Sequence, residues 1–474
     1  MPATEIAGVA PGAAVDPVRA GDTGPAGQVR ALTGFGRTAW SRAEVLHPRT
    51  TPELVASGQG PRAGLARGGG AAYGDAALNR DGRILDLGEL AGVLALDPRA
   101  GRVHVLGGTS LAAVLRAVIP VGWTLPVVPG TTLATVGGAI ASDVHGKNHH
   151  ADGAFGAHVE RLRLITPRED RWIGPGEDPE AFGATLGGMG LTGAIAEAVI
   201  RLAPLPAPTV LVDTWRTDTL DETIERLLEA DAREYVIGWV DLLHSAAGRA
   251  VVTAADHAPA PADADPLTPL PAAAAVPSPR VRITRTPPVP VVRPGLNRVY
   301  NALRWHRAPC QARARPEPLA HHLFPLDAVG GWNNLYGRGG LIQYQLVVPA
   351  AAVGLLREVI DAVAAERLPV YLATVKRMGP ASGAPLSFPL EGWTLALDLP
   401  GDAPAAGPLL HRLDQRVAEA GGRVYLTKDV RLGRAAFEAM YPGLDAWRET
   451  RARLDPDGVL RSDLGARLGL CAGR

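Results

Sequence analysis

Short runs in which apolar and polar residues alternate recur along the first part of the chain. Residues 82–87, 101–106 and 194–202 follow this pattern, and each run begins at a glycine or directly after one. Alternation with a period of two predicts half-buried strands, and the frequent glycine and proline residues predict tight turns. Residues 110–118 are apolar at helical spacing, and residues 178–186 open with Asp and Pro, a common helix start. The region that ends near Pro204 is therefore predicted to be α+β.

A second α+β region is predicted to begin at Thr209, with a sheet backed by helices. Residues 258–280 interrupt it with a sequence rich in Pro and Ala, which we expect to form a flexible loop because such a composition cannot bury a core. The predicted strands are 210–215, 235–242, 341–348 and 393–399, and residues 423–427, which end just before Lys428, are also strand-like. The predicted helices are 221–230, 351–365 and 408–420.

Composition restricts the classes of function. A chain of 474 residues with 46% hydrophobic residues is long enough for two domains with sizeable cores. Acidic and basic residues balance at 48 each, so the overall charge favours neither nucleic acid nor an anionic membrane surface, and specificity is expected to come from a pocket. The two cysteines, Cys310 and Cys471, form neither a disulfide framework nor a metal cluster.

The sequence also bears on location. No run approaches the roughly 18 apolar residues that a membrane-spanning helix needs. Residues 1–28 lack the basic start and continuous apolar core of a signal peptide, and they are predicted to form a disordered tail. We therefore expect a cytoplasmic protein, or one with at most a peripheral association with a membrane.

Lysine is almost absent from the chain. Only Lys147, Lys376 and Lys428 occur among 48 basic residues. Arg serves wherever a fixed positive charge is enough, whereas an ammonium group can change its pKa and exchange a proton. The three lysines are either remnants of compositional drift or residues that Arg cannot replace.

Four glycine-rich segments in the first region could approach phosphate groups closely: 67–75, 129–132, 136–139 and 187–193. Together they predict a large dinucleotide-like ligand. Gly188 to Gly193 matches G-x-G-x-x-G, with Asp213 twenty residues after Gly193, but a predicted helix precedes it and a predicted strand follows. The Rossmann motif requires the opposite order, so we do not assign one here.

The order of several motifs resembles one family. RGGGAAYGD, TVGGAIASDVHGKNHHADGAFG, LGGMGLTG and the C-terminal YLTKD and DPDGVLRSDL resemble the FAD-binding domain of the vanillyl-alcohol-oxidase type. Within that group, HGKNHH, LIQYQLVVP, PLSFPLEGW and RVYLTKD are similar to the decaprenylphosphoryl-β-D-ribose 2'-oxidase family. The resemblance runs from about Gly34 to Leu470.

The resemblance implies an α+β flavoprotein with two domains. Residues 29–204 and 423–474 would form the FAD-binding domain from two α+β subdomains, and residues 205–422 the substrate-binding domain, whose antiparallel sheet is backed by helices. Members that bind FAD covalently through the first loop have a His where this chain has Ala71, so the flavin is expected to be non-covalent. The implied cofactor-binding residues are Arg67, Gly68, Gly69, Gly70, Ala71, Tyr73, Gly74, Asp75, Gly130, Thr135, Val136, Gly137, Gly138, Ser142, His145, Ile195 and Tyr425.

The resemblance also implies roles at the flavin. Oxidation of a secondary alcohol needs a base for the hydroxyl proton, and Lys428 and His145 are the implied catalytic residues. Lys147 and Lys376 would bind a substrate phosphate, and Gln343 and Gln345 would face one side of a strand toward the sugar. Tyr73 and Trp239 would form pocket walls.

A metal site is a weaker interpretation of the histidines. His145, His149 and His150 have spacings that could share a helical face, but the glycines and Asp152-Gly153 argue against a helix there, and no carboxylate or Cys pattern accompanies them. We predict no metal.

The implied reaction is the oxidation of the 2'-hydroxyl of a polyprenylphosphoryl ribofuranose, the first half of an epimerisation to arabinose in cell-wall arabinan synthesis, with a partner keto-reductase. Thr394, Ala396 and Leu323 depart from the family pattern near the sugar pocket, so the exact substrate stays open. The alternatives are oxidation of another sugar or nucleoside, a flavin-free binding or scaffold protein, and a nicotinamide-dependent dehydrogenase. Neither the electron acceptor nor the oligomeric state follows from the sequence.

Overall fold

A computed structural model describes residues 27–244, 248–260 and 268–472. Most of the predicted tail and residues 261–267 of the predicted Pro/Ala loop lie outside these ranges. Within them, no helix has the length and apolar character needed to cross a membrane.

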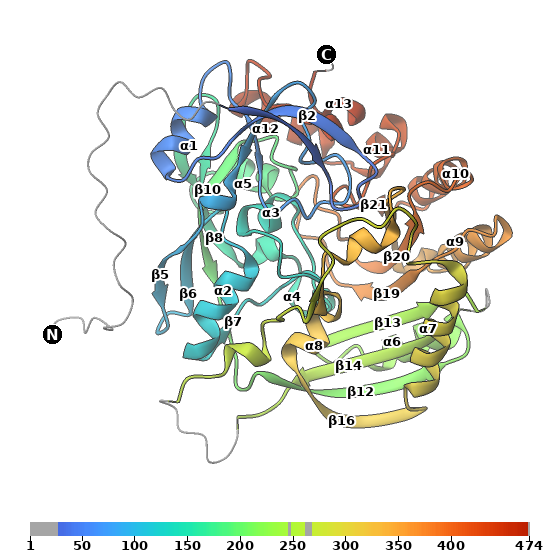
Figure 1. Ribbon diagram of the computed structural model, residues 1–474. Helices are drawn as coiled ribbons and strands as arrows, with labels where there is room; N and C mark the ends of the chain where they lie inside the picture. The colour runs from blue at the N-terminus through green and yellow to red at the C-terminus, as the bar shows by residue number, and fades with distance from the viewer. Residues whose placement is uncertain (1–26, 245–247, 261–267, 473–474) are drawn as a thin grey trace.

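Two sheets carry the N-terminal part of the chain, which is blue to teal in Figure 1. The helices that pack against them are α1 (Thr51–Gly58), α2 (Leu111–Val118), α3 (Val136–Ala141) and α5 (Pro179–Thr185). The first sheet has the order β1 (Gln28–Thr33), β2 (Trp40–Leu46), β4 (Arg83–Asp86) and β3 (Leu65–Arg67). The second, antiparallel sheet has the order β5 (Val93–Asp97), β6 (Arg102–Leu106), β10 (Ala194–Arg201), β8 (Val159–Ile165) and β9 (Asp170–Ile173).

Helix starts in this part follow from single residues. The Asp178 side chain accepts a hydrogen bond from the Ala181 amide, and Pro179 occupies the first helical position of α5. Ser110 caps α2 in the same way through the Ala113 amide. Both caps satisfy backbone donors that have no partner inside the helix, and both helices were predicted from the sequence.

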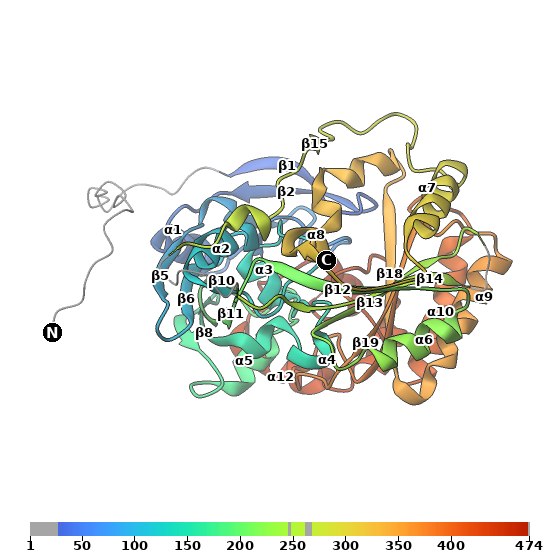
Figure 2. The same ribbon diagram turned by 90° about the horizontal axis from the view of Figure 1, so that it is seen from below.

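One eight-stranded sheet dominates the rest of the molecule, and its neighbouring strands all pair antiparallel. Helices α6 (Leu220–Glu229), α9 (Gly354–Ala365) and α10 (Ala406–Glu419) cover one face of it, as Figure 2 shows. The strand order is β16 (Gln311–Pro318), β12 (Thr209–Thr217), β14 (Arg249–His257), β13 (Tyr235–Asp241), β19 (Leu372–Met378), β20 (Gly392–Pro400), β18 (Leu341–Pro349) and β21 (Arg423–Val424).

The alternation along these strands separates the two faces of the large sheet. In β20, Leu395, Leu397 and Leu399 join the hydrophobic core shared with the helices. Because successive side chains of a strand point to opposite faces, Thr394 and Asp398 lie on the other face. The residues of neighbouring strands on that face include Trp239 in β13, Lys376 in β19, and Gln343 and Gln345 in β18.

The remaining elements link these parts. The two-stranded pairs are β7 (Trp123–Thr124) with β11 (Ala203–Pro204), and β15 (Val281–Arg282) with β17 (Val329–Gly330). The other helices are α4 (His149–Asp152), α7 (Pro294–Arg307), α8 (Leu319–Leu323), α11 (Arg434–Met440), α12 (Leu444–Leu454) and α13 (Asp463–Leu468).

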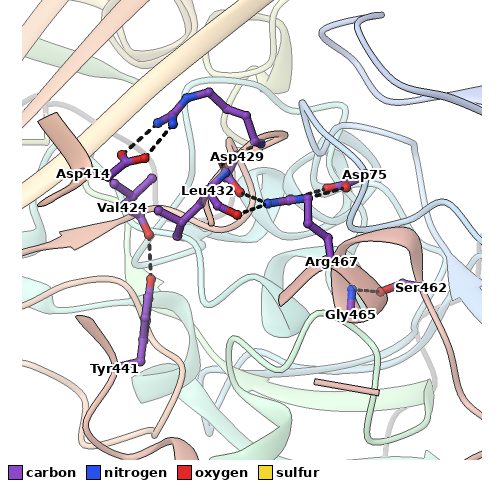
Figure 3. Close-up of polar contacts among 10 residues, drawn as sticks. Asp75, Asp414, Val424, Asp429, Leu432, Tyr441, Ser462, Gly465 and Arg467 are labelled. Carbon is purple, nitrogen blue, oxygen red and sulfur yellow. Dashed lines mark hydrogen bonds and ion pairs between the residues drawn. The ribbon is translucent and has the colours of Figure 1, made fainter. Parts of the chain in front are cut away.

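An ion-pair network fastens the C-terminal segment to the N-terminal part, as Figure 3 shows. Arg467 of α13 binds Asp75 at 2.8 and 3.0 Å and Asp429 at 2.8 Å. Arg431 pairs in turn with Asp414 of α10. Asp75 and Asp429 are buried and have lost most of their hydration. The positive charge of Arg467 compensates for that loss.

The structure confirms the α+β class, with an antiparallel sheet backed by helices. The domain boundaries stay a prediction. β21 still belongs to the large sheet, so the chain leaves that sheet just after the predicted boundary at residue 423.

Three local predictions are wrong. Residues 425–428 form a turn instead of a strand, because the Lys428 amide donates to the Tyr425 carbonyl. Residues 149–152 form one helical turn, since Asn148 accepts from the amides of residues 151 and 152. Within the predicted Pro/Ala loop, Ala275 and Val276 are buried in a hydrophobic cluster, because a short 3-10 turn at 272–274 directs them inward.

Candidate active site

Two glycine-rich loops of the N-terminal part meet at close range. A Cβ atom on Gly68 would lie 2.1 Å from Oγ1 of Thr135, so only glycine fits there. Thr135 caps α3 through the Gly138 amide. The Arg67 guanidinium donates to the carbonyls of Ala77 and Thr33, so this side chain braces the first loop.

The first loop presents a row of free amide donors. Within the described residues, no protein acceptor meets the backbone N–H groups of residues 69–72. Consecutive free N–H groups in a glycine loop form a concavity suited to an anion. The donor set therefore fits a pyrophosphate group such as that of FAD.

The same loop holds the C-terminal turn that carries Lys428. The Tyr73 amide donates to the Thr427 carbonyl at 2.9 Å. A Cβ on Gly74 would lie 1.7 Å from the Asp429 carbonyl oxygen, so the two backbones are in contact. Residues more than 350 positions apart are thus held together next to the glycine cradle.

Lys428 is partly buried, and its ammonium nitrogen lies 3.8 Å from the centroid of the Tyr73 ring. Burial lowers the pKa of Lys428 to about 8, and the negative charge of Asp398 opposes this shift. An amine with a pKa near neutrality can exchange a proton at physiological pH.

His145 and Lys376 form a second group on the sheet face described above. The Lys376 ammonium donates to His145 Nδ1 at 3.0 Å and to the Gly146 carbonyl at 2.7 Å. Burial, with Lys147 and Lys428 nearby, lowers the pKa of Lys376 to about 7. Burial and the neighbouring Lys376 hold the pKa of His145 well below its ordinary value, so this imidazole is neutral.

Lys147 approaches the same region from the loop between α3 and α4. Its ammonium group donates to the carbonyl of His322, a residue of α8. Burial and the nearby Arg304 lower the pKa of Lys147 to about 8. The charges of Lys147 and Lys428 both lower the pKa of Lys376, so the three ammonium groups are close enough to repel one another.

Two amides and a carboxylate line the sheet face between the lysines. Gln345 lies 3.0 Å from His145 Nε2 and donates to Thr394 at 3.2 Å, while Gln343 donates to Asp398. Burial raises the pKa of Asp398 to about 6. The sequence prediction missed Asp398, although its position four residues after Thr394 in an alternating strand could have placed it on the same face.

Aromatic residues enclose this group. Tyr425 stacks on Phe388 with ring centroids 4.6 Å apart, and both rings flank His145. The Tyr425 hydroxyl donates to the Ser142 carbonyl at 3.0 Å. The buried ring of Trp239 packs under the Arg304 guanidinium. Phe388 and Arg304 were not predicted from the sequence.

Of the remaining predicted cofactor residues, three lie together at the backbone of Gly107 and one, Gly130, is exposed away from described neighbours. Gly137 donates from its amide to the Gly107 carbonyl, and the Ile195 carbonyl lies against Gly107, so both border the same backbone. Val136 is fully buried beside them. Gly130 is exposed, and no described heavy atom would contact a Cβ placed there.

The histidines next to Lys147 have structural partners. His149 Nδ1 accepts from the Gly379 amide at 3.1 Å, and His150 Nε2 lies 2.8 Å from the Arg233 carbonyl oxygen. Among the residues that the structure covers, no group of three or more His, Cys, Asp or Glu side chains could hold a metal ion.

Comparisons with known proteins relate this chain to FAD-binding oxidoreductases. Residues 53–173 match the FAD binding domain family. The chain is 36% identical over 458 residues to decaprenylphosphoryl-beta-D-ribose oxidase of Mycolicibacterium smegmatis, a match that covers 93% of this chain and 97% of the relative. An uncharacterized protein of Streptomyces coelicolor is 39% identical over 76% of this chain and 100% of its own length. Cytokinin dehydrogenase 6 of Oryza sativa subsp. japonica is 30% identical over 45% of this chain and 44% of its own length.

Proposed function

The chain belongs to the decaprenylphosphoryl-β-D-ribose oxidase family of FAD-dependent oxidoreductases, and we propose that it oxidises the 2'-hydroxyl of a polyprenylphosphoryl-β-D-ribofuranose to a ketone. The observation that carries this proposal is the placement of the chain's only three lysines: Lys376 lies on one face of the large sheet, the charges of Lys147 and Lys428 both act on it, and Lys428 lies against Tyr73 of the glycine loop. Compositional drift gives no reason for three lysines far apart in sequence to meet at one site.

The proposed FAD site uses the free amides of residues 69–72 for the pyrophosphate, and the loop from Thr135 to Gly138 beside it. We propose that the remaining predicted cofactor residues complete the contacts. FAD, when bound, accepts the hydride that leaves the sugar carbon. Ala71 stands where covalent binding would need a nucleophile, so we infer non-covalent binding.

We propose that Lys428 is the base that removes the proton of the substrate hydroxyl. Oxidation breaks the O–H and C–H bonds at one carbon and forms a C=O bond, so one proton and one hydride leave. The neutral Lys428 amine, which is present above a pKa of about 8, can take the proton. Asp398 stabilises the resulting ammonium group electrostatically.

His145 is a weaker candidate for the base. Its pKa is held well below the ordinary value by burial and by the neighbouring lysines, so it accepts a proton poorly. We propose instead that His145 positions the Lys376 ammonium group through their hydrogen bond.

Lys147 and Lys376 are proposed to bind the substrate phosphate. Among the described residues, the ammonium groups of Lys147 and Lys376 form hydrogen bonds only with neutral acceptors, carbonyl oxygens for both and the His145 ring for Lys376. A phosphate would therefore supply the direct anionic partner that neither ammonium group has. Gln343 and Gln345 are proposed to contact sugar hydroxyls, with Tyr73 and Trp239 as walls.

The proposed product is a keto sugar, so its conversion to the arabino epimer requires a separate hydride donor. We infer a partner keto-reductase for this second half-reaction, as in cell-wall arabinan synthesis, and a cytoplasmic or peripheral membrane location. A second candidate function is oxidation of another sugar or nucleoside. Thr394 favours it, because this residue departs from the family pattern and accepts a hydrogen bond from the side-chain amide of Gln345, a proposed sugar-binding residue.

Anaerobic flavin reduction tests the proposal. The FAD-loaded protein is mixed with polyprenylphosphoryl ribose, a short-chain phosphoribosyl analogue, free ribose and nucleosides. We expect bleaching of the flavin absorbance near 450 nm with the phosphoribosyl compounds alone. Bleaching only by a nucleoside or free sugar would select the second candidate, and protein that stays colourless after FAD is added would exclude both.

A further inference from the structure

One basic stretch of the surface takes no part in the proposed chemistry. Between Asp265 and Glu317 the sequence has no acidic residue and nine arginines. All nine side chains are exposed. Among the described residues, only Arg313 of the nine forms an ion pair, with Asp213 at 3.9 Å. The overall balance of acidic and basic residues therefore conceals a strongly basic segment.

Helix α7 within this segment turns an apolar stripe toward solvent. Leu296, Val299, Tyr300 and Leu303 follow the spacing of a single helix face. They are 49–60% exposed, whereas the buried residue of this helix is Asn301. A surface helix ordinarily packs such an apolar stripe against the core, but α7 exposes it to solvent.

The apolar surface continues into the chain that precedes α7. Val289 and Val291 are also exposed, and they line a shallow hollow together with Arg293 and Leu296. Figure 2 shows this olive to yellow segment running along the outer edge of the molecule from β15 to α7. We call the exposed apolar residues of this segment, with Arg293 and Arg307 at the two ends of the helix, the docking face.

The docking face is fixed to the rim of the candidate active site. Asn297 donates to the Tyr371 carbonyl at 2.8 Å, and Asn301 donates to Asp241 at 2.9 Å. Arg304 of the same helix lies over the Trp239 ring, 4.6 Å from its centroid, and its charge lowers the pKa of Lys147. The helix that carries the docking face therefore also contacts Trp239 and acts on Lys147 of the proposed substrate site.

We propose that the docking face binds the surface of an anionic membrane. Arginines without acidic partners supply the attraction to lipid headgroups, and the apolar stripe enters the boundary between headgroups and acyl chains. Long Arg side chains can keep their charge at the headgroups while the neighbouring apolar residues insert. An acidic protein surface would satisfy the charges, but it would offer no hydrocarbon for the exposed apolar stripe that lies between the arginines.

This location suits a lipid-linked substrate, a point that rests on the proposed function. The phosphate of such a substrate lies at headgroup level while its chain stays in the bilayer. Docking through α7 would bring Lys147 and Trp239 close to that level, so the substrate need not leave the membrane completely.

Vesicle flotation with the full-length, FAD-loaded chain tests the docking. We expect the protein to float with vesicles of phosphatidylglycerol mixed with phosphatidylcholine, to stay behind with phosphatidylcholine alone, and to be released by high salt. Absence of flotation with the anionic vesicles, or binding only to a soluble acidic protein, would overturn the proposal.

Substitutions locate the binding. The combined Leu296→Ser, Val299→Ser and Leu303→Ser variant, and separately the Arg293→Gln and Arg307→Gln variant, should each lose at least about tenfold in vesicle affinity. Leu228→Ser on α6 and Arg412→Gln with Arg416→Gln on α10 are matched controls, since they remove exposed apolar or basic groups elsewhere. Equal loss in the controls, or full binding by the α7 variants, would contradict the assigned surface.

The soluble short-chain phosphoribosyl analogue separates docking from chemistry. The α7 variants should reduce flavin with this analogue at the wild-type rate, yet react more slowly with polyprenylphosphoryl ribose in vesicles. If the analogue fails with every protein while flotation persists, the proposed function is wrong and the docking stands.

Discussion

Lys428 and Tyr73 come from opposite ends of the chain, and the Lys428 ammonium nitrogen lies 3.8 Å from the centroid of the Tyr73 ring. The ring favours the charged ammonium form, whereas burial favours the neutral amine. The backbone bond from Tyr73 to Thr427 fixes this geometry. The proposed base is therefore positioned by the loop that is proposed to hold the cofactor.

Replacing Lys428 should separate chemistry from cofactor binding. Lys428→Met keeps the length and apolar stem of the side chain but cannot take a proton, so flavin reduction should slow by roughly a hundred- to ten-thousandfold. The flavin absorbance of the purified variant should match that of the wild type, because the cradle amides are unchanged. Stopped-flow reduction measures the first quantity and the absorbance spectrum the second. Wild-type reduction by the variant would remove Lys428 from the mechanism.

Asp398 should set the pH at which the base becomes active. Its negative charge raises the pKa of Lys428 toward the ordinary value, and the amine is active only above that pKa. The wild-type reduction rate should therefore rise with pH through a midpoint near 8 and level off above it. Asp398→Asn removes the charge, lowers the pKa, and should move the whole profile to lower pH.

A profile for Asp398→Asn that stays in place, or that moves to higher pH, would contradict this coupling. Asp414→Asn serves as a control, because Asp414 is a buried carboxylate that pairs with Arg431 instead of Lys428. Its profile should keep the wild-type midpoint.

Lys376 should make substrate affinity depend on pH in the opposite sense. Its pKa is lowered to about 7, so the positive charge is complete below that pH and is lost above it. A phosphodiester substrate keeps its single negative charge throughout this range. The KM should therefore rise as pH increases through about 7, although bound phosphate will itself move the midpoint upward.

Lys376→Met should raise KM by roughly ten- to hundredfold at acidic pH and should flatten its pH dependence, since a charged hydrogen bond is worth about 1.5–3 kcal/mol. Steady-state kinetics with the short-chain analogue between pH 6 and 9 measure both effects. Lys147→Met should raise KM in the same way. A change in the maximal rate alone would place Lys376 in the chemistry instead of in phosphate binding.

The sequence predicted those features that depend on local patterns. Alternation identified β18 and β20, and Asp178 with Pro179 identified the start of α5. The resemblance led to the three lysines, which the structure brings together. Asp398 was missed because its role depends on its neighbours Gln343 and Lys428, which a single strand pattern does not reveal.

The turn at Lys428 was missed for a related physical reason. Val424 to Thr427 are apolar or β-branched residues typical of strands, but the large sheet pairs only with Arg423 and Val424. The Tyr73 amide instead donates a hydrogen bond to the Thr427 carbonyl. Long-range contacts override the local preference here, and a sequence read locally cannot supply them.

Arg467 should be important for stability and for the cofactor loop together. Arg467→Met removes the partner of two buried carboxylates, Asp75 and Asp429, while it preserves most of the side-chain volume. Leaving buried charges unpaired costs about 3–5 kcal/mol. The concentration of guanidinium chloride that unfolds half of the protein should therefore fall clearly. FAD affinity should fall as well, because Asp75 follows Tyr73 and Gly74 in the loop that holds the C-terminal turn.

Arg412→Gln is the matched control, since its ion pair with Glu366 is exposed and should change stability by less than about 1 kcal/mol. Equal effects of the two substitutions would mean that the buried network does not fasten the C-terminal segment.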